Sequence, residues 1–214
     1  MRSTIVGMTS LTEQLPYVYA FPDALGTGLL VHTESVLDDE IRDRIGSFIH
    51  EYEVVLSRFR DDSIVGRMRT AAHGGTFDFP DWASGLFGLY DRLLAATDGA
   101  IDPCVGEDLI RLGYDPALSF TVEADAGERL GALHGRAVWG RDVVRSSGTT
   151  LVTRSPVHVD FGACGKGYLV DSLGGLLTDS ELSRTSHVKS AETTNPTCQS
   201  SISDSKRESA APEF

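Results

Sequence analysis

The segment VHVDFGACGKGYLVDSL, residues 157–173, contains the strongest structural signals in this chain. Alternating apolar residues predict a strand over 157–161, and three glycines within six residues then lead into a helix. Amide N–H groups at the start of a helix have no partner within it, and the helix dipole favours an anion there. Lys166 adds a cation suited to a phosphate, and Asp160 is placed to bind a ligand hydroxyl or a base. The spacing matches neither G-x-x-x-x-G-K-[ST] nor G-x-G-x-x-G, so a plain strand-to-helix connection is the alternative to an anion site.

A second segment, LSRFRDDS at residues 56–63, follows the clearest helical pattern in the chain. Apolar residues recur at three- and four-residue steps over 38–59, which predicts an amphipathic helix. Phe59 is suited to stacking on a planar ring, and Arg58 to holding a loop or a phosphate. A solvated helix end with a polar turn is the alternative interpretation of these residues.

A third segment, TDGAIDP at residues 97–103, forms a turn of small residues after a second predicted helix, 81–96. Asp102 must be extended, because a following proline disfavours the helical region for its predecessor. The small residues bring backbone amides close to anything bound there. The alternative is a plain loop leaving the helix.

The remaining pattern predicts an α+β protein with a mixed sheet and packed helices. A short helix is expected near 124–133, followed by a series of short strands separated by glycine-containing turns. The expected strands are 25–32, 136–139, 143–145, 150–154 and 157–161.

Composition excludes several classes of function. The formal net charge is −12, so a basic nucleic-acid-binding surface is not expected. Hydrophobic residues make up 41% and charged residues 23%, and no apolar stretch is long enough to span a membrane. No secretory signal is recognisable near the start, so a cytoplasmic location is expected. The three cysteines lack C-x-x-C spacing and indicate neither a zinc site nor a disulfide framework.

The character of the sequence changes after Leu177. Residues 178–214 contain no glycine, one aromatic residue and 14 serines or threonines, and apolar periodicity is lost. Such a segment buries too little apolar surface to offset its ordering entropy, which predicts disorder. The expected organisation is a lead-in over 1–24, a domain over 25–177 and this tail over 178–214.

Taken together and in this order, the three segments resemble the FAD:protein FMN transferases, the ApbE-type family. The resemblance covers residues 25–177, and LSRF…DDS, TDGAIDPCVG and VDFGACGKGYLVDSL carry it. It implies an ApbE-like flavin transferase fold. It also implies an activity that uses Mg²⁺ to cleave the pyrophosphate of FAD, transfers FMN to a threonine hydroxyl of an acceptor protein and releases AMP.

The resemblance also implies positions that contact FAD. Leu25 stands in place of a methionine that touches the flavin, and Phe59 matches an aromatic residue on the isoalloxazine ring. Ala100, Ile101 and Asp102 match the family's A-F-D segment beside FAD, with Ile101 replacing its aromatic residue.

Two further FAD-contacting positions and one metal position follow from the third segment. Asp160 and Lys166 match family positions that contact FAD. Ala163 matches a position that supplies a metal ligand, and an alanine has only its backbone carbonyl to offer a hard cation such as Mg²⁺. The resemblance assigns no residue of this chain a catalytic role.

The chain departs from the family pattern after residue 177. A G-G-D/N strand, a histidine-containing segment and a late aspartate/threonine metal cluster are not recognisable in 178–214. The chain is therefore expected to be truncated, with weakened or absent transferase activity. The alternatives are a non-catalytic FAD-binding module, an inactive remnant of the family, or a product that does not fold stably.

Overall fold

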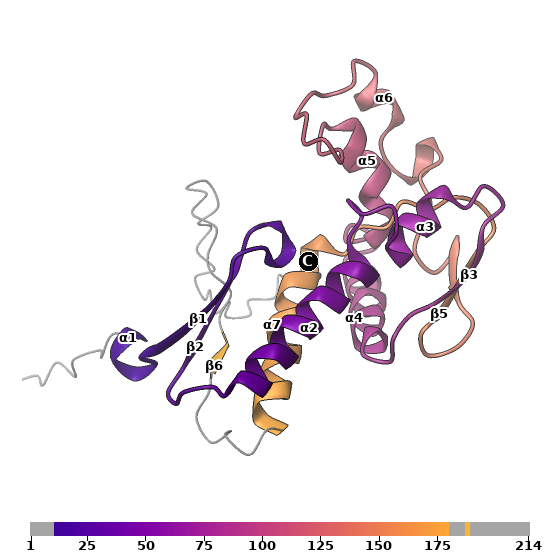
Figure 1. Ribbon diagram of the computed structural model, residues 1–214. Coiled ribbons are helices and arrows are strands. Elements are labelled where there is room, and N and C mark those ends of the chain that lie inside the picture. Colours follow the sequence, from indigo (N-terminus) through magenta and orange to yellow (C-terminus); the bar gives the residue numbers. More distant parts are fainter. Residues whose placement is uncertain (1–10, 180–186, 189–214) are drawn as a thin grey trace, which may run out of the picture.

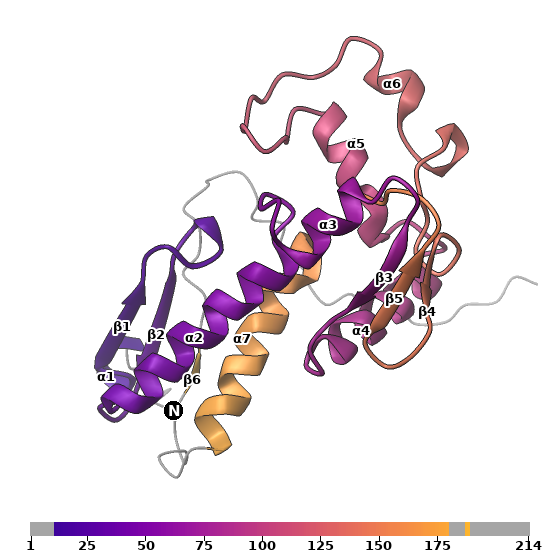
Figure 2. The same cartoon turned by 45° about the vertical axis from the view of Figure 1, so that its right-hand side comes forward.

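Two long antiparallel helices, α2 (Asp39–Leu56) and α7 (Gly162–Asp179), lie side by side at the centre of the computed structural model, which describes residues 11–179 and 187–188 (Figures 1 and 2). The side chain of Asp38 caps α2 by accepting a hydrogen bond from the Ile41 amide, 2.8 Å away. The predicted helix 38–59 is thus confirmed, although it ends at Leu56. Helix α7 starts at Gly162, so the three glycines expected to lead into the helix lie within its first two turns.

Two small sheets flank this helix pair, and the α+β class is confirmed. One sheet has the order β1-β2-β6, with β1 (Tyr17–Phe21), β2 (Leu29–Thr33) and β6 (His187–Val188). The other has the order β3-β5-β4, with β3 (Gly75–Asp78), β5 (Thr150–Thr153) and β4 (Val143–Arg145). Every pair of these strands is antiparallel, and an isolated bridge between Trp139 and Val143 is parallel.

Shorter helices connect these layers. The predicted helix 81–96 is observed as α4, and the expected helix near 124–133 is observed as α6 followed by a 3-10 turn. Helices α5 and α6 project together at the end of the molecule near the start of α7 (Figure 2). The remaining elements are α1 (Leu11–Gln14), η1 (Ala24–Gly26), α3 (Ile64–Thr70), α4 (Ala83–Ala96), η2 (Pro103–Val105), α5 (Gly106–Arg111), α6 (Ala126–Arg129) and η3 (Ala132–His134).

Two predicted strands, 136–139 and 157–161, are wrong, because neither segment lies in a sheet. Residues 157–160 hydrogen-bond to α3, η2 and α5 rather than to a strand. The Val157 amide donates to the carbonyl of Met68 (3.2 Å), and the Asp160 amide donates to the carbonyl of Pro103 (2.7 Å). The predicted strand 25–32 is also shorter than expected, because η1 occupies its first residues and β2 starts at Leu29.

An aromatic cluster fixes the segment that enters α7. Phe87 and Tyr90 of α4 pack against Phe161, with ring centroids 5.8 and 5.4 Å away. Trp139 contacts Phe87 and Phe161 at 5.6 and 6.0 Å. All four side chains are buried. Large buried aromatic groups dominate core energetics, so this cluster holds the start of α7 against α4.

The predicted lead-in and tail lie partly outside the described residues. Strand β1 falls in the second half of the predicted lead-in and pairs with β2 from Tyr17↔Thr33 to Phe21↔Leu29. In the predicted tail, α7 continues to Asp179 and β6 pairs with β2. The other residues of the predicted tail, 180–186 and 189–214, lie outside the described residues, and the prediction of disorder concerns them. Within residues 11–179 and 187–188, no helix is both long and apolar enough to cross a membrane.

Candidate functional site

The three segments singled out in the sequence meet at Asp160. Its carboxylate forms an ion pair with Arg58, with 2.5 Å between Oδ2 and Nε. Its amide donates to the carbonyl of Pro103, at the end of the segment 97–103. One residue thus joins the end of α2, the loop after α4 and the start of α7.

Arg58, the partner of Asp160 in this ion pair, is buried. Only 7% of its side chain is exposed, and its Nη2 donates a hydrogen bond of 2.7 Å to the carbonyl of Tyr114. The guanidinium carbon lies 4.2 Å from the ring centroid of Phe59 and 4.5 Å from that of Tyr114. A buried charge needs both a partner and satisfied hydrogen bonds. Arg58 has an ion-pair partner in Asp160 and a hydrogen bond to the Tyr114 carbonyl, whereas its buried Nε is not aligned for a hydrogen bond. These two contacts hold Arg58 beside Asp160.

The first turn of α7 is held from two sides. The Tyr52 hydroxyl donates to the carbonyl of Gly165 (2.8 Å), and the Tyr90 hydroxyl accepts from the amide of Cys164 (3.3 Å). Burial raises the pKa of both tyrosines above the ordinary value, so both hydroxyls stay neutral at physiological pH.

This turn also presents groups suited to an anion. The carboxylate of Asp160 accepts from the amide of Gly162 (2.6 Å). Within the described part of the chain, the amide of Ala163 has no acceptor and Lys166 has no ion-pair partner. Ala163 and Lys166 are both exposed. An open amide and a free cation at the start of an 18-residue helix can bind a phosphate.

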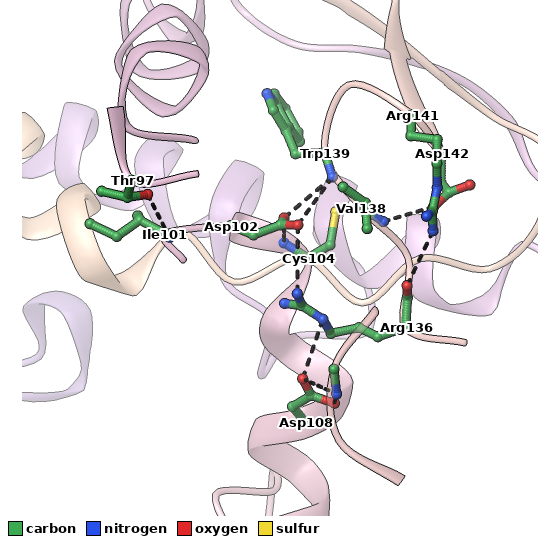
Figure 3. Close-up of polar contacts among 11 residues, drawn as sticks. Thr97, Ile101, Asp102, Cys104, Asp108, Arg136, Val138, Trp139, Arg141 and Asp142 are labelled. Carbon is green, nitrogen blue, oxygen red and sulfur yellow. Dashed lines mark hydrogen bonds and ion pairs between the residues drawn. The ribbon is translucent and has the colours of Figure 1, made fainter. Parts of the chain in front are cut away.

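Asp102 lies inside the protein, in a network that joins residues 102–108 to the loop that contains Arg136 and Trp139 (Figure 3). Its carboxylate accepts from the amides of Cys104 (2.8 Å) and Trp139 (3.3 Å). Arg136 lies 3.7 Å from Asp102 and 3.3 Å from Asp108, measured between charged atoms. Only 1% of the Asp102 side chain is exposed, so this carboxylate orders the loops around it.

The cysteine of this network is not activated. Burial and the neighbouring Asp102 carboxylate raise the pKa of the Cys104 thiol. The thiolate is the nucleophilic form of cysteine, so the neutral Cys104 is unsuited to nucleophilic chemistry.

The structure brings some of the predicted site residues together and leaves others apart. Arg58 contacts both the Phe59 ring and the Asp160 carboxylate, so Phe59 lies near Asp160. Ala163 and Lys166 lie in α7, which begins two residues after Asp160. The remaining predicted positions are dispersed: Ala100 is exposed, Ile101 is half-buried, Asp102 faces inward, and Leu25 lies in η1 with its amide donating to Glu53.

Sequence reasoning missed the residues that support this site. Tyr114 accepts the hydrogen bond from Arg58, and Tyr52 and Tyr90 hold α7. Tyr52 and Tyr90 lie on the buried faces of α2 and α4, so helical spacing is a signal that could have identified them as core residues. Tyr114 lies in a loop without periodicity, so no pattern pointed to it.

Comparison with known protein families agrees with this arrangement. A family model described as ApbE family matches residues 25–186. The chain belongs to the ApbE family. The resemblance inferred from the three segments is therefore confirmed, and all three lie within the matched range.

Solved structures of ApbE proteins share the fold. The apo form of Pseudomonas stutzeri flavinyl transferase ApbE matches with a TM-score of 0.57 at 21% identity, covering 73% of this chain and 53% of that one. Vibrio cholerae flavin transferase ApbE matches with a TM-score of 0.62 at 21% identity, covering 76% of this chain and 53% of that one. The ApbE protein of Thermotoga maritima matches with a TM-score of 0.59 at 20% identity, with the same two coverages. The chain thus spans about half the length of these structures. The search of curated proteins finds no match.

The described residues do not form a magnesium site by themselves. Among them, no three His, Cys, Asp or Glu side chains are grouped so that they could hold a metal ion. Ala163, the predicted ligand, lies in the first turn of α7, where a carbonyl accepts an intrahelical hydrogen bond. Mg²⁺ takes six oxygen ligands in near-octahedral geometry, and one carbonyl is a small part of such a shell.

Two open hollows among the described residues lie away from Asp160. One, of about 640 Å³, is lined by residues of α2 including Glu40, Asp43 and Glu51, together with Leu176 of α7. Another, of about 810 Å³, lies between β1 and α2. Carboxylates repel phosphates, so the first hollow is a poor site for a dinucleotide. Neither is lined by a residue of the three segments.

Proposed function

We propose that this chain binds FAD and transfers its FMN portion to a threonine hydroxyl of an acceptor protein, releasing AMP, in a Mg²⁺-dependent reaction. The observation that carries the proposal is the meeting of three family segments at Asp160, through Arg58 at 2.5 Å and Pro103 at 2.7 Å. The Pseudomonas stutzeri and Vibrio cholerae proteins are described as flavinyl and flavin transferases, which supports the same class of activity here.

The residues around Asp160 suit a flavin at one end and phosphates at the other. Phe59 is 42% exposed and offers a ring face to the isoalloxazine system. The Ala163 amide and Lys166 face solvent at the start of α7 and suit the pyrophosphate. Asp160, held by Arg58, is positioned to accept a hydrogen bond from a ligand hydroxyl or ring N–H.

In the proposed transfer, the threonine oxygen attacks the phosphorus of the FMN portion. A new P–O bond forms to threonine, the pyrophosphate P–O bond breaks so that its bridging oxygen leaves on AMP, and the hydroxyl proton passes to solvent. Such a reaction depends mainly on positioning and on stabilising charge. When bound, magnesium would neutralise phosphoryl charge. The family resemblance assigns it the Ala163 carbonyl, and the described residues contain no group of three or more His, Cys, Asp or Glu side chains that could hold it.

A second candidate is FAD binding without transfer. It is favoured by that same absence of an acidic cluster among the described residues. The two candidates differ in whether AMP is released.

The experiment incubates the purified 214-residue chain with FAD, MgCl₂ and a peptide that contains the acceptor threonine. Mass spectrometry of the peptide and chromatography of the nucleotides are the readouts. Transfer predicts a peptide that gains one FMN unit and one AMP released per peptide, at a rate below that of the Vibrio cholerae enzyme. Bound FAD without AMP indicates the second candidate. If FAD does not bind, both are wrong.

Lys166→Ala is expected to weaken FAD binding by about 10- to 100-fold, because one charge-assisted hydrogen bond to a phosphate is worth about 1.5–3 kcal/mol. Riboflavin, which lacks phosphate, should bind the variant and the unsubstituted chain equally. Calorimetric titration with both ligands is the measurement. Arg44→Ala, which removes an exposed cation of α2, is the matched control and should leave both affinities unchanged. Equal FAD affinity for Lys166→Ala and the unsubstituted chain would contradict a phosphate at α7.

A further inference from the structure

The loop between α5 and α6 exposes an unusual set of large apolar side chains. Tyr114 is 41% and Phe120 72% exposed, and three aliphatic residues beside them are also exposed: Leu112, Leu118 and Val122. Single exposed apolar residues are ordinary on protein surfaces, whereas a contiguous set marks a place where something binds.

Two of these residues continue the aromatic surface that starts at Phe59. The ring centroids of Phe59 and Tyr114 are 5.6 Å apart at an interplanar angle of 76°. Those of Tyr114 and Phe120 are 6.5 Å apart at 25°, close to parallel. We call Phe59, Tyr114 and Phe120 the aromatic platform.

A buried cation supports the platform from within. The Arg58 guanidinium lies against the rings of both Phe59 and Tyr114, and Arg58 itself is buried. The exposed area of these two rings is therefore on sides that Arg58 does not cover. The same Arg58 is paired with Asp160, so the platform is continuous with the meeting point of the three segments.

The backbone of the loop that exposes Phe120 is strained at two residues. Phe120 and Leu118 have φ angles of +50° and +51°, in the left-handed region that side chains other than glycine disfavour. The Phe120 amide donates to the carbonyl of Gly113 (2.8 Å), and the amide of Glu123 donates to the carbonyl of Arg111 (2.8 Å). Strained residues that a loop nonetheless holds in place are concentrated at binding sites.

We propose that Tyr114 and Phe120 contact the isoalloxazine ring of FAD that stacks on Phe59. Because the Tyr114 ring lies at 76° to Phe59 and Phe120 is close to parallel with Tyr114, these two rings meet the flavin in an edge-to-face arrangement. The inference rests on the proposed function and adds two residues to its site. Three fused rings are too large for one phenyl ring to cover, and two further aromatic rings lie beside Phe59. Stacking on aromatic side chains is the common way in which proteins bind flat ring systems.

The test measures affinities for FAD, FMN and AMP by calorimetry, with quenching of flavin fluorescence as a second readout. Phe120→Ser is expected to weaken FAD and FMN binding about tenfold and to reduce quenching, and to leave AMP binding unchanged. Tyr114→Leu should act in the same direction, and Phe120→Trp should retain affinity. Leu133→Ser, at a residue that is 97% exposed on η3, is the matched control and should change nothing.

Three outcomes overturn the proposal. Unchanged FMN affinity in Phe120→Ser shows that the platform does not touch the flavin. Weakened AMP binding with unchanged FMN binding places the adenine ring there instead. Unchanged affinity for all three nucleotides, with weaker binding of an acceptor peptide, makes the platform a protein-binding surface. A chain that binds no FAD even without substitution instead refutes the proposed function itself.

Discussion

Arg58→Met is expected to lower the free energy of unfolding by about 3–5 kcal/mol, the usual cost of removing one partner of a buried ion pair. The substitution leaves the carboxylate of Asp160, itself only 13% exposed, without its cation. It also leaves the Tyr114 carbonyl without its donor and removes the support beneath two rings. FAD binding should be lost, because the segment 56–63 would no longer be joined to Asp160. Urea denaturation and FAD titration are the measurements.

The control for this substitution is Arg60→Met, two residues further along the chain. Arg60 pairs with Asp62 on the surface, where ion pairs contribute little. Arg60→Met should leave the free energy of unfolding and the affinity for FAD unchanged. Arg58→Lys keeps the charge but not the planar fork, and it should restore only part of the stability. Similar unfolding curves for Arg58→Met and Arg60→Met would contradict the role given to the buried pair.

Asp102→Ala is expected to destabilise the protein by a similar amount, about 3–5 kcal/mol. Its removal leaves two buried amides without their acceptor and takes a carboxylate from Arg136. Because Asp108 still faces Arg136, the guanidinium keeps one of its two partners. Thermal and chemical denaturation are the measurements.

Asp102→Asn separates the structural role of this residue from contact with FAD. An amide oxygen can still accept from Cys104, so the loss of stability should be smaller than for alanine. FAD affinity measured on this folded variant then reports ligand contact alone. Asp81→Ala, which removes an exposed aspartate just before α4, is the control and should be nearly neutral. Equal stability of Asp102→Ala and Asp81→Ala would contradict the network around Asp102.

The sequence was most informative where structure depends on local pattern. The apolar stripes over 38–59 and 81–96 correctly predicted α2 and α4, because one face of each helix packs into the core. Pro103 correctly predicted an extended Asp102, which has φ −130° and ψ 123°. The strand predicted at 157–161 was wrong, because its partners are the carbonyls of Met68 and Pro103.

The sequence identified the segments that form the candidate site, and it did not predict the contacts between them. Arg58 was interpreted as a residue that holds a loop or a phosphate; it does hold the loop of Tyr114, whereas its ion pair with the Asp160 carboxylate was not predicted. No local pattern joins two residues so far apart along the chain. The inward position of Asp102 depends on Arg136 and Trp139, which come from a distant loop. Motif order identified the family, and tertiary contacts decided which side chains remain available to a ligand.

The most direct test of the account is a two-dimensional ¹H–¹⁵N NMR titration of the ¹⁵N-labelled chain with FAD. We predict saturable shifts of the amides of Gly162, Ala163 and Lys166, together with Phe59. Lys166→Ala should weaken the response at the start of α7. Saturable shifts confined to the hollow along α2, around Glu40 and Asp43, would contradict the claim that FAD binds where the three segments meet at Asp160.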